Sequence, residues 1–274
     1  MLRSNQPQSA AGRLARRWVL EAQMSGLFKF QKAILAAAQQ HWMPLVDEHR
    51  EELGETIKNH IFDLHGPRHL PRRLNAREQY FSRIFYGFTE IFTSLDTLDD
   101  IAFYVRRFPF EGTRITRERY LQFHVESHYS EIYVLRERLY SYITIFRRQF
   151  RRDPQLPDVE KRCDALTVVL GSALAGVVGL RGRHIHRARF SDDAIDRLST
   201  IGLLSRGSDS SEFSILMRNY YREEHKNVRG IWRGRMRENV KAIRQLLDAF
   251  FEALLPMVFD PETEMLRYPR GIRT

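Results

Sequence analysis

The run from Arg181 to His186 combines the residue types best suited to chemistry in this chain, in the order RGRHIH. It follows an apolar segment that we expect to be helical, and another such segment comes soon after it. Arginine supplies a fixed positive charge, and histidine carries a proton that titrates near neutral pH. An arginine and a histidine held at a helix end could cleave RNA without a metal ion, because the 2′-hydroxyl group of RNA is an internal nucleophile.

The spacing of this pair does not identify a site. An arginine followed after four to six residues by a histidine occurs four times in the chain, and random placement gives about four such pairs. The other pairs join Arg117 and Arg119 to His124, and Arg218 to His225. A second interpretation is that Arg181 and His186 cap a helix C-terminus, where positive charge is favoured. The significance of the pair therefore depends on its surroundings.

Composition favours a helix-rich globular protein. The chain has 274 residues, of which 43% are hydrophobic and 28% are charged, with only 10 prolines and 15 glycines. This length suits one large or two medium domains and can bury a substantial core. The net charge is +10, nearly all of it from arginine, which suits an anionic polymer as partner. The alternative is a basic surface that only contacts solvent.

The single cysteine, Cys163, excludes an intramolecular disulfide and a cysteine-based zinc cluster. It indicates a reducing, cytoplasmic location, and we expect it to be buried as a small apolar residue. The longest apolar stretch, residues 165–180, is shorter than the roughly 20 residues that a bilayer needs, so no membrane partner is expected. The first twenty residues are basic and carry no acid, which is typical of a targeting peptide or of a basic arm; we favour the arm.

Apolar residues recur at helical spacing along most of the chain, and no segment alternates as a strand would. Pro44 should end or kink a helix, and Gly230 and Gly234 should interrupt the last one. The predicted fold is all-α: an antiparallel helical bundle at residues 111–258, preceded by a helical region at 1–110 and followed by a tail at 259–274. Helices are expected over residues 15–65, 75–94, 96–107, 116–152, 157–180, 192–204 and 211–255.

The order of segments around the RGRHIH run resembles the HEPN superfamily of helical nucleases and nucleotide-binding modules. In that family an arginine–histidine motif closes a core helix, and a segment like FSDDAIDRL, which begins here at Phe190, often follows it. The earlier helical segments YLQFHVE from Tyr120 and EIYVLRERL from Glu131 are also similar. The resemblance covers about residues 114–258.

This resemblance implies a metal-independent endoribonuclease that needs no cofactor and acts as a homodimer, with two motifs facing each other. Arg181 would stabilise the charged transition state and His186 would transfer protons, giving a 2′,3′-cyclic phosphate. His184 could compete for the proton-transfer role, and Gly182 stands where many active members have a polar residue. The implied role is that of a toxin or an antiviral or stress-defence effector. The alternative is a non-catalytic module of the same fold that binds RNA or a protein.

His124 and His128 are four residues apart and share a helix face with Glu131. No third ligand accompanies them in the sequence, so we expect a polar seam and no metal site. Glu126 or Glu131 could reach across the bundle and orient Arg181.

Basic residues recur every three or four positions along the last predicted helix and would form one continuous stripe, here called the basic row. With Arg183 and Arg187 it is the predicted RNA-binding surface; its alternative is the solvated face of an amphipathic helix. The predicted partners are RNA, a second copy of the chain and a regulatory protein. The sequence has no Gly-rich phosphate loop, no GxSxG and no HExxH. The basic row consists of Arg218, Arg222, Lys226, Arg229, Arg233, Arg237, Lys241 and Arg244.

Overall fold

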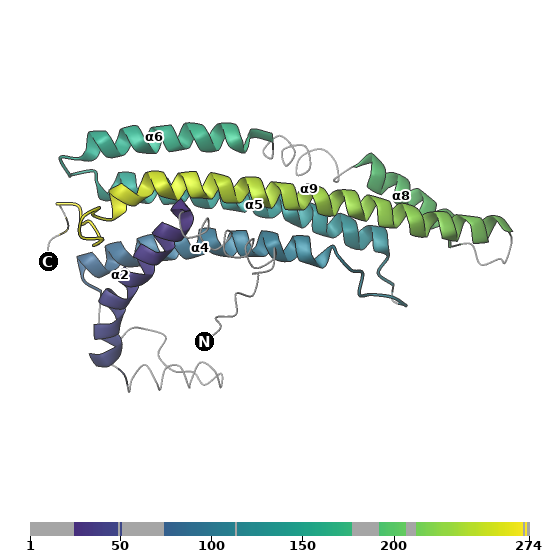
Figure 1. Ribbon diagram of the computed structural model, residues 1–274, viewed down its shortest axis with the longest axis horizontal. Helices are drawn as coiled ribbons and strands as arrows, with labels where there is room; N and C mark the ends of the chain where they lie inside the picture. The colour runs from purple at the N-terminus through teal and green to yellow at the C-terminus, as the bar shows by residue number, and fades with distance from the viewer. Residues whose placement is uncertain are drawn as a thin grey trace, which may run out of the picture. The chain divides into compact units, whose positions relative to one another are not determined.

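The computed structural model is all-helical in the part of the chain that it describes, which confirms the predicted fold class (Figure 1). Those residues contain six helices and no strand, apart from an isolated bridge between Phe259 and Leu266. None of these helices is long and apolar enough to span a membrane. The residues described are 25–48, 50, 74–112, 114–176, 192–206, 212–270 and 272.

The chain forms two compact units that interleave along the sequence. The first unit comprises residues 1–86, 145–163 and 245–274, and the second comprises 87–144 and 164–244. Residue 110, where a domain boundary was expected, lies inside the second unit. The linear division into residues 1–110, 111–258 and 259–274 stays a prediction.

Helix interruptions were predicted from sequence at three places, and at each of them the helix continues. Pro44 lies inside α2, which continues to Glu48, and the segment predicted as two helices around residue 95 is the single helix α4. Gly230 and Gly234 lie within α9, which is also uninterrupted. The helices are α2 Gly26–Glu48, α4 Ala76–Tyr104, α5 Arg117–Gln149, α6 Leu156–Ala173, α8 Asp193–Leu204 and α9 Glu212–Val258.

Two helix starts follow directly from side-chain capping. The Asn75 side chain accepts a hydrogen bond from the Glu78 backbone N–H at 2.9 Å, and the Glu78 carboxylate accepts from the Asn75 N–H at 2.8 Å. This reciprocal capping box begins α4 at the predicted residue. Asp192 caps α8 through a single hydrogen bond, accepting from the Ile195 N–H at 3.1 Å.

In the first unit, α2 packs closely against the C-terminal part of α9. Phe30 lies 4.7 Å from Phe251 between ring centroids, and both rings are fully buried. Gly26 makes this approach possible, because a Cβ atom there would lie 2.2 Å from the Asp248 carbonyl oxygen.

Cys163 is buried, as predicted.

In the second unit, α4, α5, α8 and α9 share one hydrophobic core. Their apolar faces are spaced at three and four residues, which is why these helices form as amphipathic elements. Burial of each large side chain contributes roughly 1.5–3 kcal/mol to folding. The core residues are Ile101, Val105, Leu121, Val125, Ile195, Leu198, Val228, Trp232 and Met236.

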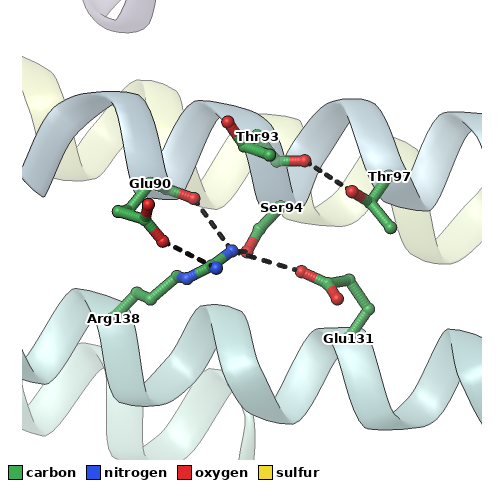
Figure 2. A network of polar contacts seen from close by, with 6 residues as sticks. All are labelled: Glu90, Thr93, Ser94, Thr97, Glu131 and Arg138. Carbon is green, nitrogen blue, oxygen red and sulfur yellow. Dashed lines mark hydrogen bonds and ion pairs between the residues drawn. The ribbon is translucent and has the colours of Figure 1, made fainter. Parts of the chain in front are cut away.

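A polar network ties α5 to α4 within this unit (Figure 2). The Arg138 guanidinium donates to the Glu90 carbonyl oxygen at 3.0 Å and to the buried Ser94 hydroxyl. It also pairs with the Glu90 carboxylate at 2.7 Å and with Glu131 at 3.5 Å. One arginine therefore satisfies a buried hydroxyl group and fixes the register of two helices.

Candidate nucleic-acid interface

The RGRHIH run lies outside the described residues, which stop at 176 and resume at 192. The roles of Arg181, Arg183, His184, His186 and Arg187 are therefore predictions from sequence. The segment that follows the run is described from Asp192 on: Asp192 caps α8, and Ile195 and Leu198 enter the core of the second unit.

The basic row lies along one side of α9 as the spacing predicts. Arg222, Lys226, Arg237 and Lys241 are exposed, whereas Arg229 is half-buried. Within the described ranges, Arg244 is the one member that pairs with an acid, and its partner is Asp99 of α4. A run of cations without acidic partners along one helix is suited to a partner that carries several negative charges.

Several cations act together on Arg233, near the middle of α9. Arg237 lowers the pKa of the Arg233 guanidinium most, burial adds to the effect, and Arg106 and Arg229 lower the pKa further. The Nε atom of Arg233 is buried without a hydrogen-bond partner in the described part of the protein. We call Arg106, Arg229, Arg233 and Arg237 the arginine cluster. Like charges this close repel one another, so a bound anion would relieve the repulsion.

Arg106 is a member of this cluster that sequence reasoning missed. It follows the C-terminal end of α4, more than a hundred residues before the basic row. The packing of Ile101 and Val105 against Val228 and Trp232 brings that end of α4 to α9. No spacing rule could find the contact, because it depends on tertiary packing.

A buried polar cluster lies under the N-terminal part of α9. Glu118, at the start of α5, is 4% exposed, accepts a hydrogen bond from the Tyr221 hydroxyl at 2.6 Å and pairs with Arg206. Burial and the bond to Glu118 raise the pKa of Tyr221. Close by, burial lowers the pKa of His225 to about 4, with Arg229 and Arg117 lowering it further. The Tyr221 and His225 rings stack at 6.3 Å between centroids.

The predicted polar seam of His124 and His128 consists of buried, neutral rings. Burial lowers the pKa of His128 to about 4, and its Nε2 atom lies 3.3 Å from the Asn239 side-chain amide. Burial also lowers the pKa of His124. The described residues contain no group of three or more metal-binding side chains.

The predicted supporting carboxylates have other partners in the described structure. Glu126 accepts a hydrogen bond from Gln122 at 3.0 Å, and Glu131 pairs with Arg138. Because Arg181 lies outside the described residues, a contact between it and either carboxylate stays a prediction.

Comparisons with protein-family models, with curated proteins and with solved structures found no match. The resemblance to HEPN proteins therefore rests on the sequence segments quoted above. The geometry of the second unit adds a cationic surface that joins α4 to α9 and a set of buried histidines beneath it.

Proposed function

We propose that this protein is a HEPN-type, metal-independent endoribonuclease that acts as a homodimer in defence or stress responses. The observation that carries the proposal is the basic row of α9, strengthened by Arg106 and left without acidic partners along most of its described length. From Arg218 to Arg237 the row extends about 28 Å along the helix, at 1.5 Å per residue. That length can contact several consecutive phosphates.

The histidines of the second unit support the assignment of the chemistry to the RGRHIH run. His124, His128 and His225 are buried with lowered pKa values, so they stay neutral at pH 7 and make poor proton carriers for a substrate. His184 and His186 are the remaining histidines in the part of the sequence that resembles HEPN proteins.

In the proposed reaction, His186 removes the proton from the 2′-hydroxyl group as its oxygen attacks the adjacent phosphorus. The bond from phosphorus to the 5′ oxygen breaks, and His186 returns its proton to the leaving oxygen, so no net proton is consumed. Arg181 stabilises the additional negative charge on the phosphate in the transition state. The products are a 2′,3′-cyclic phosphate and a 5′-hydroxyl end.

A non-catalytic module that binds RNA through the same surface is the second candidate, because the exposed cations of the basic row would attract RNA whether or not His186 is catalytic. A toxin kept inactive by a regulatory protein is a variant of the first candidate. The catalytic and the non-catalytic interpretations both have RNA as the partner. They differ in whether His186 takes part in cleaving it.

The test compares wild-type protein with His186→Ala on mixed RNA in the presence of EDTA, with His184→Ala as the neighbouring control. We expect cleavage by the wild type, cyclic-phosphate ends in the products, and a loss of about 100-fold or more in His186→Ala. Equal cleavage by wild type and His186→Ala would remove the catalytic assignment. RNA binding without any cleavage would favour the non-catalytic module.

A further inference from the structure

A pocket of about 840 Å³ lies in the second unit, between the end of α4, the loop that follows it and the first turns of α5. A smaller hollow of about 440 Å³ adjoins it and shares Tyr104, Pro109 and Tyr120. The volume of the larger pocket falls within the range of roughly 300–1,000 Å³ typical of small-ligand sites. We call the two hollows together the aromatic–arginine pocket.

Aromatic rings around this pocket are exposed to an unusual degree for large apolar side chains. Phe123 is 63% exposed, Phe103 is 59% exposed and Tyr104 is 49% exposed. The rings meet edge to face or tilted, as between Tyr120 and Phe110 at 5.7 Å between centroids, so none of them is stacked flat on another. Exposed ring faces gathered at a concave surface mark a binding site.

The same pocket is lined by cations without acidic partners. Arg114 and Arg119 line the larger hollow, and Arg106 and Arg107 line the smaller one. All four side chains are exposed, and none forms an ion pair within the described part of the chain. The acid of the connecting loop, Glu111, pairs with Arg117 instead.

His124 closes the inner wall of the pocket. Its ring is 8% exposed and lies 4.3 Å from the Tyr120 ring between centroids. Its Nδ1 atom has no hydrogen-bond partner among the described residues. The ring is neutral because burial lowers its pKa, so it presents a polar edge without adding a charge to the aromatic wall.

Ring faces beside guanidinium groups match the chemistry of an unpaired nucleotide. Bases of any sequence stack on aromatic side chains, and each stacked base strengthens binding. Arginines bind the adjoining phosphates. A duplex cannot bind in this way, because its bases are already stacked and paired. An acidic peptide would pair with the arginines but would leave the ring faces without a matching group.

We propose that the aromatic–arginine pocket binds an unstacked base of single-stranded RNA, with the neighbouring phosphates on Arg106, Arg107, Arg114 and Arg119. The choice of RNA rests on the function proposed above, whereas the choice of a single strand rests on the pocket. Because Arg106 also belongs to the arginine cluster, a strand held here can continue onto the basic row.

The test measures binding of the full-length protein, in a His186→Ala background that prevents cleavage, to fluorescein-labelled RNA of mixed sequence about 12 nucleotides long. Phe123→Ala should weaken single-strand binding about tenfold and leave duplex binding unchanged. Phe213→Ala is the matched control, since Phe213 is a 58% exposed ring on α9 that does not line the pocket. Equal effects of the two substitutions, or wild-type affinity for duplex at least as high as for single strand, would overturn the proposal.

Crosslinking locates the contact independently. Single-stranded RNA carrying 4-thiouridine should crosslink to peptides that contain Tyr104 or Phe123, and crosslinks found only on α9 would contradict the pocket. A polyglutamate competitor tests the peptide alternative: if it displaces the RNA at equal charge concentration from wild type and Phe123→Ala alike, the pocket recognises charge and not bases.

The outcomes separate this proposal from the ribonuclease. One outcome is that single-strand binding depends on Phe123 but the wild-type protein does not cleave RNA. That outcome would support the pocket proposal and contradict the ribonuclease proposal. A second outcome is that cleavage depends on His186, while Phe123→Ala changes neither kcat/KM nor the affinity for single-stranded RNA. That outcome would support the ribonuclease proposal and contradict the pocket proposal.

Discussion

The second unit contains buried residues that can titrate. Their burial makes the free energy of unfolding depend on pH. His128 is 1% exposed and has a pKa of about 4, because burial disfavours its charged form. In the unfolded chain the same imidazole titrates near its ordinary value of 6.5. Protons therefore bind preferentially to the unfolded state when the pH falls below about 6.5.

The first prediction follows from this difference in pKa. Between pH 7 and pH 5, His128 should reduce the free energy of unfolding by about 2 kcal/mol, and its effect should level off near pH 4. The variant His128→Gln keeps a polar group facing Asn239 but cannot titrate, so its free energy of unfolding should fall less over the same range. Urea unfolding at a series of pH values measures both, and parallel curves for the two proteins would contradict the prediction.

The second prediction concerns Glu118, the carboxylate that satisfies the Tyr221 hydroxyl. Glu118→Ala removes a buried carboxylate and leaves the partly buried Tyr221 hydroxyl and the Arg206 guanidinium without their acceptor, so it should lower the free energy of unfolding by about 2–3 kcal/mol. Glu137, whose side chain is 49% exposed and pairs with Arg136, provides the control. Glu137→Ala should change stability by no more than about 0.5 kcal/mol. Denaturant unfolding of both variants decides whether burial makes the difference.

The sequence predicted where helices begin more accurately than whether they continue without interruption. Asn75 and Asp192 were expected to begin helices and do cap them, because capping depends on a side chain and the backbone within three residues. Pro44 was expected to end or kink a helix and Gly230 to interrupt one, and the helices continue through both residues. Packing stabilises a long helix by more than one unfavourable residue costs, and packing cannot be read from local sequence.

The third prediction tests these tolerated glycines. A Cβ atom at Gly230 or Gly234 would meet nothing within 4 Å, and both positions are exposed in α9. Gly→Ala at either position should raise the free energy of unfolding by about 0.5–1 kcal/mol, because alanine loses less backbone entropy in a helix. Gly202→Ala should bring no such gain, because its Cβ would lie 3.1 Å from the Tyr221 ring. Thermal melts of the three variants would contradict the prediction if all three shifted alike.

For the molecule as a whole, the informative quantity is the distribution of its +10 net charge. Sequence spacing predicted the basic row, since a helix places every third or fourth residue on one face. It could not predict that Arg106 joins this surface, or that the exposed rings at Tyr104 and Phe123 line one pocket. Those contacts join residues from separate helices, so only the fold brings them together.

The fourth prediction distinguishes a shaped cationic surface from net charge. The triple variant Arg222→Gln, Lys226→Gln and Arg237→Gln should weaken RNA binding and reduce the slope of log affinity against log salt by about 0.7 for each phosphate that it no longer neutralises. The control neutralises three exposed cations of the first unit, Arg152, Lys161 and Arg162, and has the same net charge. Equal slopes in the two triple variants would mean that net charge, and not the basic row, determines binding.

Gly26 has an evolutionary consequence. Its missing side chain lets the start of α2 approach the Asp248 carbonyl so closely that even a methyl group would overlap it. A relative that packs this helix pair in the same way must therefore keep glycine there. A relative with a larger residue would need a wider separation between the backbones of the two helices. When homologous sequences are collected, a glycine at this column should distinguish true orthologues from chains that share only helical composition.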